Sequence, residues 1–148
     1  MELVDLDSQS IIGEVVRTDN EHESQPEQQK IAPLWQRFMA KYAKGTLKGK
    51  PVYGVYFDYE SNQHGAYSVL AGAALGESES EGLTKLTTAN GSYLKFSAQG
   101  AMPETVVSLW QHIWQRFDDE NCQYQRAFVT DFECYTAVDK VDIYIGIV

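Results

Sequence analysis

The sequence has no continuous apolar segment that approaches the roughly 20 residues needed to cross a bilayer. Its N-terminal segment, MELVDLDSQS, is acidic where a secretory signal is basic and then apolar. Cysteine is scarce as well, because Cys122 and Cys134 are the only two and have neither the density of a disulfide framework nor CxxC spacing. These absences predict a cytoplasmic protein with free thiols and no membrane partner.

Positive charge is also in short supply. The chain has 12 Lys and Arg residues against 21 Asp and Glu residues, for a net charge of −9. Nucleic-acid binding draws most of its affinity from Lys and Arg on phosphates, so we expect no nucleic-acid partner. A negative field concentrates cations, which favours a positive or neutral ligand.

Motifs for catalysis and for metal binding are missing. His22, His64 and His112 are scattered, without HExxH or paired-ligand spacing. The chain has no GxSxG elbow and no glycine-rich phosphate loop. We therefore predict no catalytic residue, no metal and no cofactor, and favour a binding protein over an enzyme.

What the sequence does contain is an internal repeat. The segments PLWQRFMAKY (33–42) and SLWQHIWQRF (108–117) share Leu-Trp-Gln at an offset of 75 residues, which matches Trp35 with Trp110. Fixed self-similarity of this kind indicates duplication. We predict one domain, residues 1–148, with repeats at about 1–76 and 82–148, separated by the acidic loop GESESEG.

Each repeat has the pattern of a strand, a helix and two strands. In the first repeat we expect a strand at 10–17, a helix from about Pro26 to Lys44 with Gly45 as its cap, and a hairpin of 51–60 with 65–75. In the second we expect a strand at 92–98, a helix from Pro103, and strands at 126–135 and 140–148, with a short leading strand at 83–88. Pro33 either kinks the first helix or marks its true start.

Two βαββ units can join their sheets edge to edge and place both helices on one face. The sequence therefore predicts an α+β fold: duplicated βαββ units with pseudo-twofold symmetry, an antiparallel sheet, two main helices and a central ligand groove.

Three segments carry a resemblance to a known family. They are PVYGVYFDYESNQHGAYSVLAGAAL, GSYLKFSAQGAMPETVVSLWQHIWQRF and DFECYTAVDKVDIYIGIV. Together they resemble the gyrase-inhibitor-like superfamily, the effector-binding domain at the C-terminus of AraC-type and MerR-type transcription activators. This domain also occurs as free-standing proteins, some of them on integron gene cassettes, and we expect the free-standing form, without a DNA-binding domain.

The resemblance implies a groove that binds small molecules, often amphipathic organic cations, with an acidic anchor in an FExY strand. That motif is matched by residues 132–135, so the anchor falls on Glu133. From the residues alone, a glutamate on one face of a strand is more often a solvated charge. The family's final strand ends in Tyr-Ile-Pro, where this chain has Gly146 in place of the proline.

Other site residues follow from alternation and from the repeat. Asp131, Glu133 and Tyr135 should share one sheet face, and we expect Tyr144 to join them. The offset of 75 places Asp58 in the position that mirrors Glu133.

Aromatic walls are expected beside these acids. Tyr56 should lie next to Asp58 on the same face, and Trp110, with its repeat mate Trp35, should wall the groove. Trp110 and Trp114 also fit plain packing of a helix on a sheet.

Three functions stay open. The first is capture of an amphipathic cation by Glu133 between walls formed by Tyr56, Tyr144 and Trp110. The second is binding to a protein partner such as DNA gyrase, and the third is hydrolysis with Glu133 as general base. Acids gathered in a tyrosine-lined cleft favour the first, and acids spread over an outer face with GESESEG favour the second. A homodimer is also left open.

Overall fold

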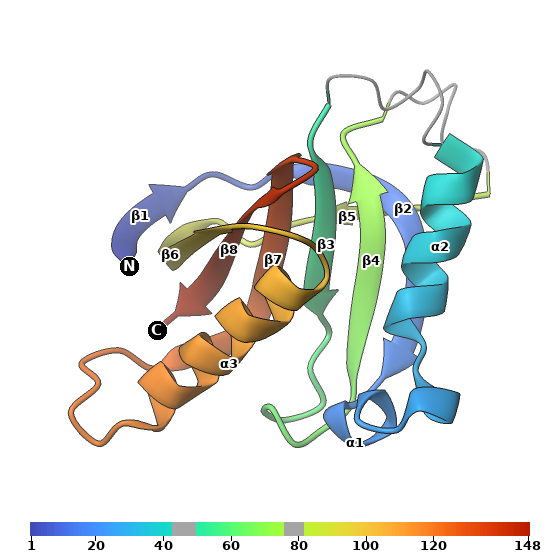
Figure 1. Ribbon diagram of the computed structural model, residues 1–148. Helices are drawn as coiled ribbons and strands as arrows, with labels where there is room; N and C mark the ends of the chain where they lie inside the picture. Colours follow the sequence, from blue (N-terminus) through green and yellow to red (C-terminus); the bar gives the residue numbers. More distant parts are fainter. Residues whose placement is uncertain (43–49, 76–81) are drawn as a thin grey trace.

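The computed structural model describes residues 1–42, 50–75 and 82–148, which form one antiparallel sheet of eight strands (Figure 1). The strands are β1 (Glu2–Leu6), β2 (Ser10–Thr18), β3 (Val52–Phe57), β4 (Tyr67–Ala73), β5 (Thr84–Thr87), β6 (Gly91–Gln99), β7 (Arg126–Ala137) and β8 (Lys140–Ile147). The helices are α1 (Asn20–Glu23), the 3-10 helix η1 (Pro26–Gln28), α2 (Ile31–Tyr42) and α3 (Glu104–Asp118). None of these helices is long and apolar enough to cross a membrane.

The strand order places the two halves of the chain side by side. The order is β1-β6-β8-β7-β3-β4-β2-β5, so β2, β3 and β4 stay together, β6, β7 and β8 stay together, and the halves join where β3 pairs with β7. This is the edge-to-edge arrangement expected of two βαββ units, and the α+β fold class is confirmed. That the units arose by duplication stays a prediction.

The first long helix starts later than predicted. It begins at Ile31 and not at Pro26, because the residues before it form α1 and η1. Pro33 therefore lies in the first turn, where its missing N–H removes no helical hydrogen bond. The predicted cap at Gly45 and the acidic segment 76–81 lie outside the described residues.

Two edge strands flank the paired units. The predicted strand at 83–88 is present as β5, which pairs with β2. At the other edge, β1 pairs with β6 in a register that sets Val4 opposite Tyr93. The strand β1 is an addition to the predicted elements, since its acidic and mostly exposed segment gives only a weak strand signal.

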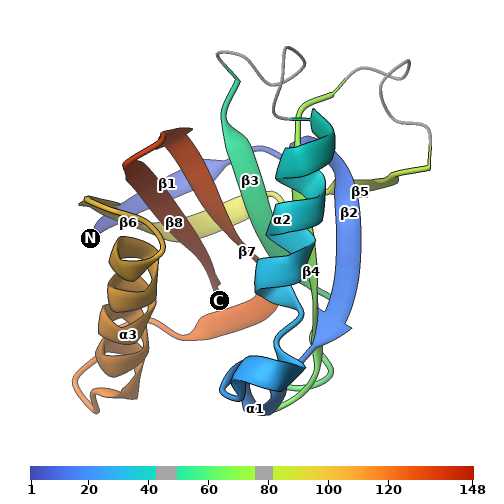
Figure 2. The same cartoon turned by 45° about the vertical axis from the view of Figure 1, so that its right-hand side comes forward.

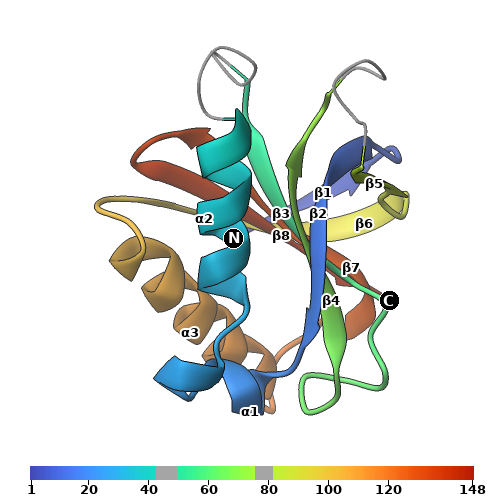
Figure 3. The same ribbon diagram turned by 90° about the vertical axis from the view of Figure 1, so that its right-hand side faces the viewer.

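Both long helices cover the same face of the sheet (Figure 3). A cluster between α2 and the first-half strands contains Ile12, Leu34, Phe38, Tyr67, Val69, Ala71, Ala73 and Leu75. A cluster between α3 and the second-half strands contains Leu94, Phe96, Val106, Leu109, Ile113, Val141, Ile143 and Ile145. Because each helix packs over its own half, the central strands β3 and β7 are left between them.

The opposite face of the sheet has its own core, formed by Ile11, Val55, Leu70, Tyr93 and Phe132. Residues two apart in a strand share a face, so the side chains of β7 divide between the two cores. Phe132 turns to this second core, and its neighbours in sequence turn toward the helices.

Candidate functional site

A cavity of about 1280 Å³ lies between α2, α3 and the central strands. Figure 2 shows the two helices on either side of β7 and β8. Four tyrosines line the cavity, Tyr56, Tyr59, Tyr67 and Tyr135, together with three tryptophans, Trp35, Trp110 and Trp114. Such an aromatic wall with few charges is typical of a small-molecule site.

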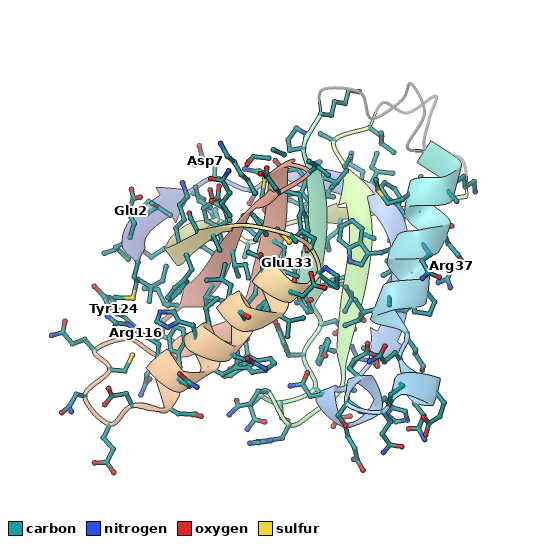
Figure 4. The ribbon with its side chains drawn as sticks, viewed as in Figure 1. Glu2, Asp7, Arg37, Arg116, Tyr124 and Glu133 are labelled. Carbon is teal, nitrogen blue, oxygen red and sulfur yellow. The ribbon has the colours of Figure 1, made fainter. Side chains whose placement is uncertain are left out.

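Glu133 lies on the sheet side of this cavity. It belongs to β7, where it pairs with Gly54 of β3 on one side and Ile143 of β8 on the other. The residue is 3% exposed, in the interior between α3 and β3, whereas Glu2 and Arg37 lie at the periphery (Figure 4). The carboxylate is therefore not a solvated surface charge.

Neutral donors surround the Glu133 carboxylate. The Trp110 indole N–H donates to Oε2 at 2.6 Å, and the Tyr56 hydroxyl donates to the same oxygen at 2.9 Å. The Tyr135 hydroxyl donates to Oε1 at 2.9 Å. The ion pairs of the described residues do not include Glu133.

Burial dominates the electrostatics of this group. It raises the pKa of the Glu133 carboxyl above its ordinary value, while the hydrogen bonds from Trp110, Tyr135 and Tyr56 oppose the rise. Burial and the Glu133 charge also raise the pKa values of the Tyr56 and Tyr135 hydroxyls. Both hydroxyls therefore stay protonated and keep donating.

Gly54 makes room for the carboxylate. A Cβ at this position would lie 2.9 Å from Glu133 Oε1 and 2.9 Å from Trp35 Cζ2. Both separations are shorter than real Cβ contacts allow. The cross-strand pairing with Gly54 thus lets the glutamate and the Trp35 ring share one small space.

Aromatic rings from both helices close around Glu133. The rings of Trp35 and Tyr135 meet edge to face at 5.5 Å, and those of Trp110 and Tyr56 at 5.2 Å. These distances are typical of favourable aromatic pairs. Trp114, whose ring lies 6.1 Å from that of Trp110, is 41% exposed and lines the outer part of the cavity.

A second carboxylate on β7, that of Asp131, is paired internally. It is fully buried and accepts hydrogen bonds from Arg126 Nη2 at 2.7 Å, the Tyr59 hydroxyl and the Gly146 amide at 2.9 Å. Gly146 stands where the resemblance implies a proline, which has no N–H to donate. The departure from that pattern therefore supplies one of the hydrogen bonds of Asp131.

Arg126 reaches Asp131 through an irregularity in β7. Simple alternation would place residues five apart on opposite faces. The pairing of β7 with β8 shifts register between Arg126 and Asp131, and Phe128 within that stretch has a φ of 54°. The shift brings the guanidinium and the carboxylate to the same side.

The other carboxylate in the cavity lining caps a helix. Glu23 accepts hydrogen bonds from the amides of Lys30 and Ile31 at the N-terminus of α2, and from the Thr18 hydroxyl. A carboxylate there satisfies helix N–H groups and faces the positive end of the helix dipole. Its charge is thus compensated by the backbone.

A family model of integron-associated effector binding proteins matches residues 2–147. The chain belongs to this family. Members of the family are effector-binding proteins, so the chain has a ligand-binding role. No curated protein matches the chain.

Solved structures agree with the family. An integron cassette protein from the mobile metagenome of Vibrio cholerae is 35% identical, with a TM-score of 0.91 over 99% of this chain and 95% of that one. The structure of SAV2435 bound to tetraphenylphosphonium is 19% identical, with a TM-score of 0.77 over 99% and 93% of the two chains. EcmrR in a complex with DNA is 13% identical, with a TM-score of 0.57 over 99% of this chain and 56% of that one. The last two show the fold alone.

In this effector-binding protein, four of the predicted site residues lie together. Glu133, Tyr56, Trp110 and Trp35 all line the cavity. Glu133 accepts hydrogen bonds from Tyr56 and Trp110. The ring of Trp35 lies against Gly54, next to the Glu133 carboxylate.

Tyr144 lies on the opposite face, which corrects the prediction. It pairs with Phe132, and the two rings stack at 4.7 Å in the second core. The register of β8 sets Ile143, and not Tyr144, beside Glu133. A shift of one residue changes the face of every side chain in a strand, and the prediction had the other register.

Asp58 is also placed differently from the prediction. It follows the end of β3, its side chain is 76% exposed, and it forms an ion pair with Arg17. The residue of β3 beside Glu133 is Gly54, so the offset that aligns the helices does not carry Asp58 to the cavity.

Three residues of the candidate site were not predicted from the sequence. Alternation puts Tyr135 on the same face as Glu133, and its position in FExY is the signal that could have indicated its hydrogen bond to the carboxylate. Gly54 and Arg126 gave no local signal, because the role of each depends on a strand or a register shift that the sequence does not mark. The hypothesis of a protein partner depends in part on the acidic segment 76–81, which lies outside the described residues.

Proposed function

We propose that this protein binds small amphipathic organic cations in the cavity between α2 and α3, with Glu133 as the charged anchor. One observation carries the proposal. The Glu133 carboxylate is buried, accepts only neutral donors, and has no place in the ion pairs of the described residues. A buried charge without a countercharge is costly, and a cationic ligand would supply the missing partner.

The surroundings of Glu133 make the attraction to a cation strong. Two unit charges 4 Å apart gain on the order of 4 kcal/mol at an effective dielectric near 20, against about 1 kcal/mol in water. Glu133 is buried, with the Tyr56 and Trp110 side chains hydrogen-bonded to its carboxylate and the Trp35 ring close by. Each aromatic face can add about 0.5–2 kcal/mol through cation–π contact.

The remaining charges of the cavity lining are compensated within the protein or exposed to solvent. Glu23 caps α2, and Arg126 is paired with Asp131. Lys50 lines the cavity but is an exposed residue. Support for the ligand class also comes from SAV2435, a protein of the same fold, which is bound to the amphipathic cation tetraphenylphosphonium.

Thermal unfolding with three matched probes tests the proposal. Tetraphenylphosphonium and tetraphenylborate have the same shape and opposite charge, and triphenylphosphine oxide is a neutral aryl compound. A ligand at 100 times its dissociation constant stabilises the native state by about 2.7 kcal/mol, enough to raise Tm by several degrees. We expect the cation alone to raise Tm of the wild type, and Glu133→Gln to lose the effect.

Equal affinity of wild type and Glu133→Gln for the cation would contradict the proposal. If none of the three probes changes Tm, binding to a protein partner becomes the favoured hypothesis. A pull-down at low salt, where contacts of an acidic surface are strongest, would then test it.

A further inference from the structure

The lining of the cavity differs between its two ends. The end near the C-terminus of β3 and the start of β7 is polar, with Asn20, Tyr59, Gln63, Tyr67 and Arg126. The end near the β7–β8 turn and the start of α3 is mainly apolar, with Val52, Met102, Val106, Val107 and Val138, although Thr136 and the exposed Lys50 also line it. Glu133 lies between these ends, so the two ends offer different partners to a ligand anchored at the carboxylate.

Arg126 is the strongest donor at the polar end. Its side chain is 9% exposed and its guanidinium lies over the ring of Phe128, 4.4 Å from the centroid. Nη2 donates to Asp131, whereas Nε is buried and has no hydrogen-bond partner among the described residues. A guanidinium has five N–H donors, so some N–H groups of Arg126 are not used by Asp131.

Arg126 lines the same cavity as the anchor, Glu133. Asp131, to which Arg126 is bonded, is two residues from Glu133 on the same face of β7, a separation of about 7 Å along a strand. Asp131 neutralises the charge of Arg126, so the guanidinium does not repel a cation at Glu133 but can still donate hydrogen bonds.

We propose that the preferred ligands are cations with an apolar body on one side of the charge and a hydrogen-bond acceptor on the other, and that Arg126 binds the acceptor. This inference rests on the proposed function and narrows its ligand class. The apolar body would occupy the end lined by Val106 and Val138, the cationic centre would lie at Glu133, and a carbonyl oxygen would reach the guanidinium.

Two matched cations test the inference. Benzyl(acetonyl)dimethylammonium and benzyl(methallyl)dimethylammonium differ only in a C=O in place of a C=CH2. Water solvates the ketone better, so a cavity without a donor for it would prefer the alkene. A hydrogen bond to a charged donor changes affinity by about tenfold, and we expect wild type to prefer the ketone by that factor in calorimetric titration.

Two variants assign this preference to Arg126. Arg126→Lys keeps a countercharge for Asp131 but loses the guanidinium, and the double variant Arg126→Gln, Asp131→Asn removes the pair without leaving a lone buried charge. In each, we expect the ketone-to-alkene ratio to fall to one or below, because a cavity without the guanidinium donor favours the alkene. Glu133→Gln should weaken both cations and leave the ratio unchanged.

The outcomes separate this inference from the proposed function. Equal binding of the two cations by wild type, or a ratio that survives in both Arg126 variants, would overturn the role of Arg126 and leave the cation site standing. The alkene cation cannot bond to Arg126 through a carbonyl, so weaker binding of this cation by Glu133→Gln tests the role of Glu133 alone. If neither cation binds wild type but tetraphenylphosphonium does, this inference falls and the cation site stands; if tetraphenylphosphonium does not bind either, both proposals fall.

Discussion

Asp131 and Glu133 are buried carboxylates two residues apart on the same face of one strand, yet their hydrogen-bond donors differ in charge. Each accepts hydrogen bonds from its surroundings. Asp131 has a cation among its donors, Arg126, whereas Glu133 has only Trp110 and two tyrosines. What distinguishes a structural carboxylate from a candidate binding group is therefore the countercharge, and not burial or the number of hydrogen bonds.

The physical reason lies in the cost of removing a charge from water. A buried ion pair recovers much of that cost through mutual attraction, and neutral donors recover less. Asp131 and Arg126 thus form a self-contained unit. Glu133 keeps part of its attraction for a partner from outside the chain.

The largest effect is expected from breaking the Asp131 pair. Arg126→Met leaves Asp131 buried without its cation, and loss of one partner of a buried pair typically costs about 3–5 kcal/mol. Chemical denaturation measures this loss. The control is Arg37→Met, since the Arg37 side chain is 54% exposed and its ion pair with Glu14 is of the surface kind that is worth at most about 1 kcal/mol. Similar losses in the two variants would show that Asp131 does not depend on Arg126.

A smaller effect is expected where Glu133 and the strand β3 meet. In Gly54→Ala the new methyl group would lie 2.9 Å from both Glu133 Oε1 and Trp35 Cζ2. Overpacking of this kind costs about 1–3 kcal/mol, and displacement of the carboxylate should also weaken binding of tetraphenylphosphonium. Unfolding and titration of the same variant measure both effects. Unchanged stability together with unchanged affinity would show that the space around Gly54 is not limiting.

The pH dependence of cation binding sharpens the comparison further. A cation binds the ionised form of Glu133, whose pKa is raised by burial. Affinity for tetraphenylphosphonium should therefore fall as pH drops through that raised pKa, by up to about tenfold per pH unit below it. Titrations of wild type and Glu133→Gln across this range measure the slope. A wild-type affinity that does not vary with pH would contradict the role of the ionised carboxylate.

The smallest effect concerns the free protein. Because the folded state raises the pKa of Glu133, the native protein binds the proton more tightly than the unfolded chain does. The stabilisation is fully present below the ordinary pKa of a glutamate and is lost as pH rises through the folded pKa. Without ligand, Glu133→Gln should therefore gain stability relative to wild type as pH rises from 4 to 8. Denaturation at each pH measures the difference, and a relative loss over this range would contradict the prediction.

Much of the fold could be predicted from local patterns. The order of strands and helices followed from hydrophobic periodicity, and the Leu-Trp-Gln repeat located both tryptophans that face Glu133, Trp35 and Trp110. The start of α2 was wrong, because the short α1 and η1 precede it. The strand β1 was missed since its acidic character obscured the alternation that half-buries Val4 and Leu6.

Site residues could be predicted only where the pattern within a single strand or helix decides which way a side chain faces. Alternation within β7 correctly grouped Glu133 with Tyr135, because side chains two apart share a face whatever the strand pairs with. Tyr144 and Asp58 required a register between strands, and for both the prediction was wrong.

The sequence by itself determined the acidic balance, the α+β order of elements and the grouping of Glu133 with Asp131 and Tyr135 on one face of β7, because these depend on composition and on local periodicity. Only the tertiary structure decided that Gly54 lies beside Glu133 and that a register shift brings Arg126 to Asp131. Such pairings join strands far apart in the chain, and a slip of one residue reverses every face. The countercharge that Asp131 has and Glu133 lacks is therefore a property of the folded sheet.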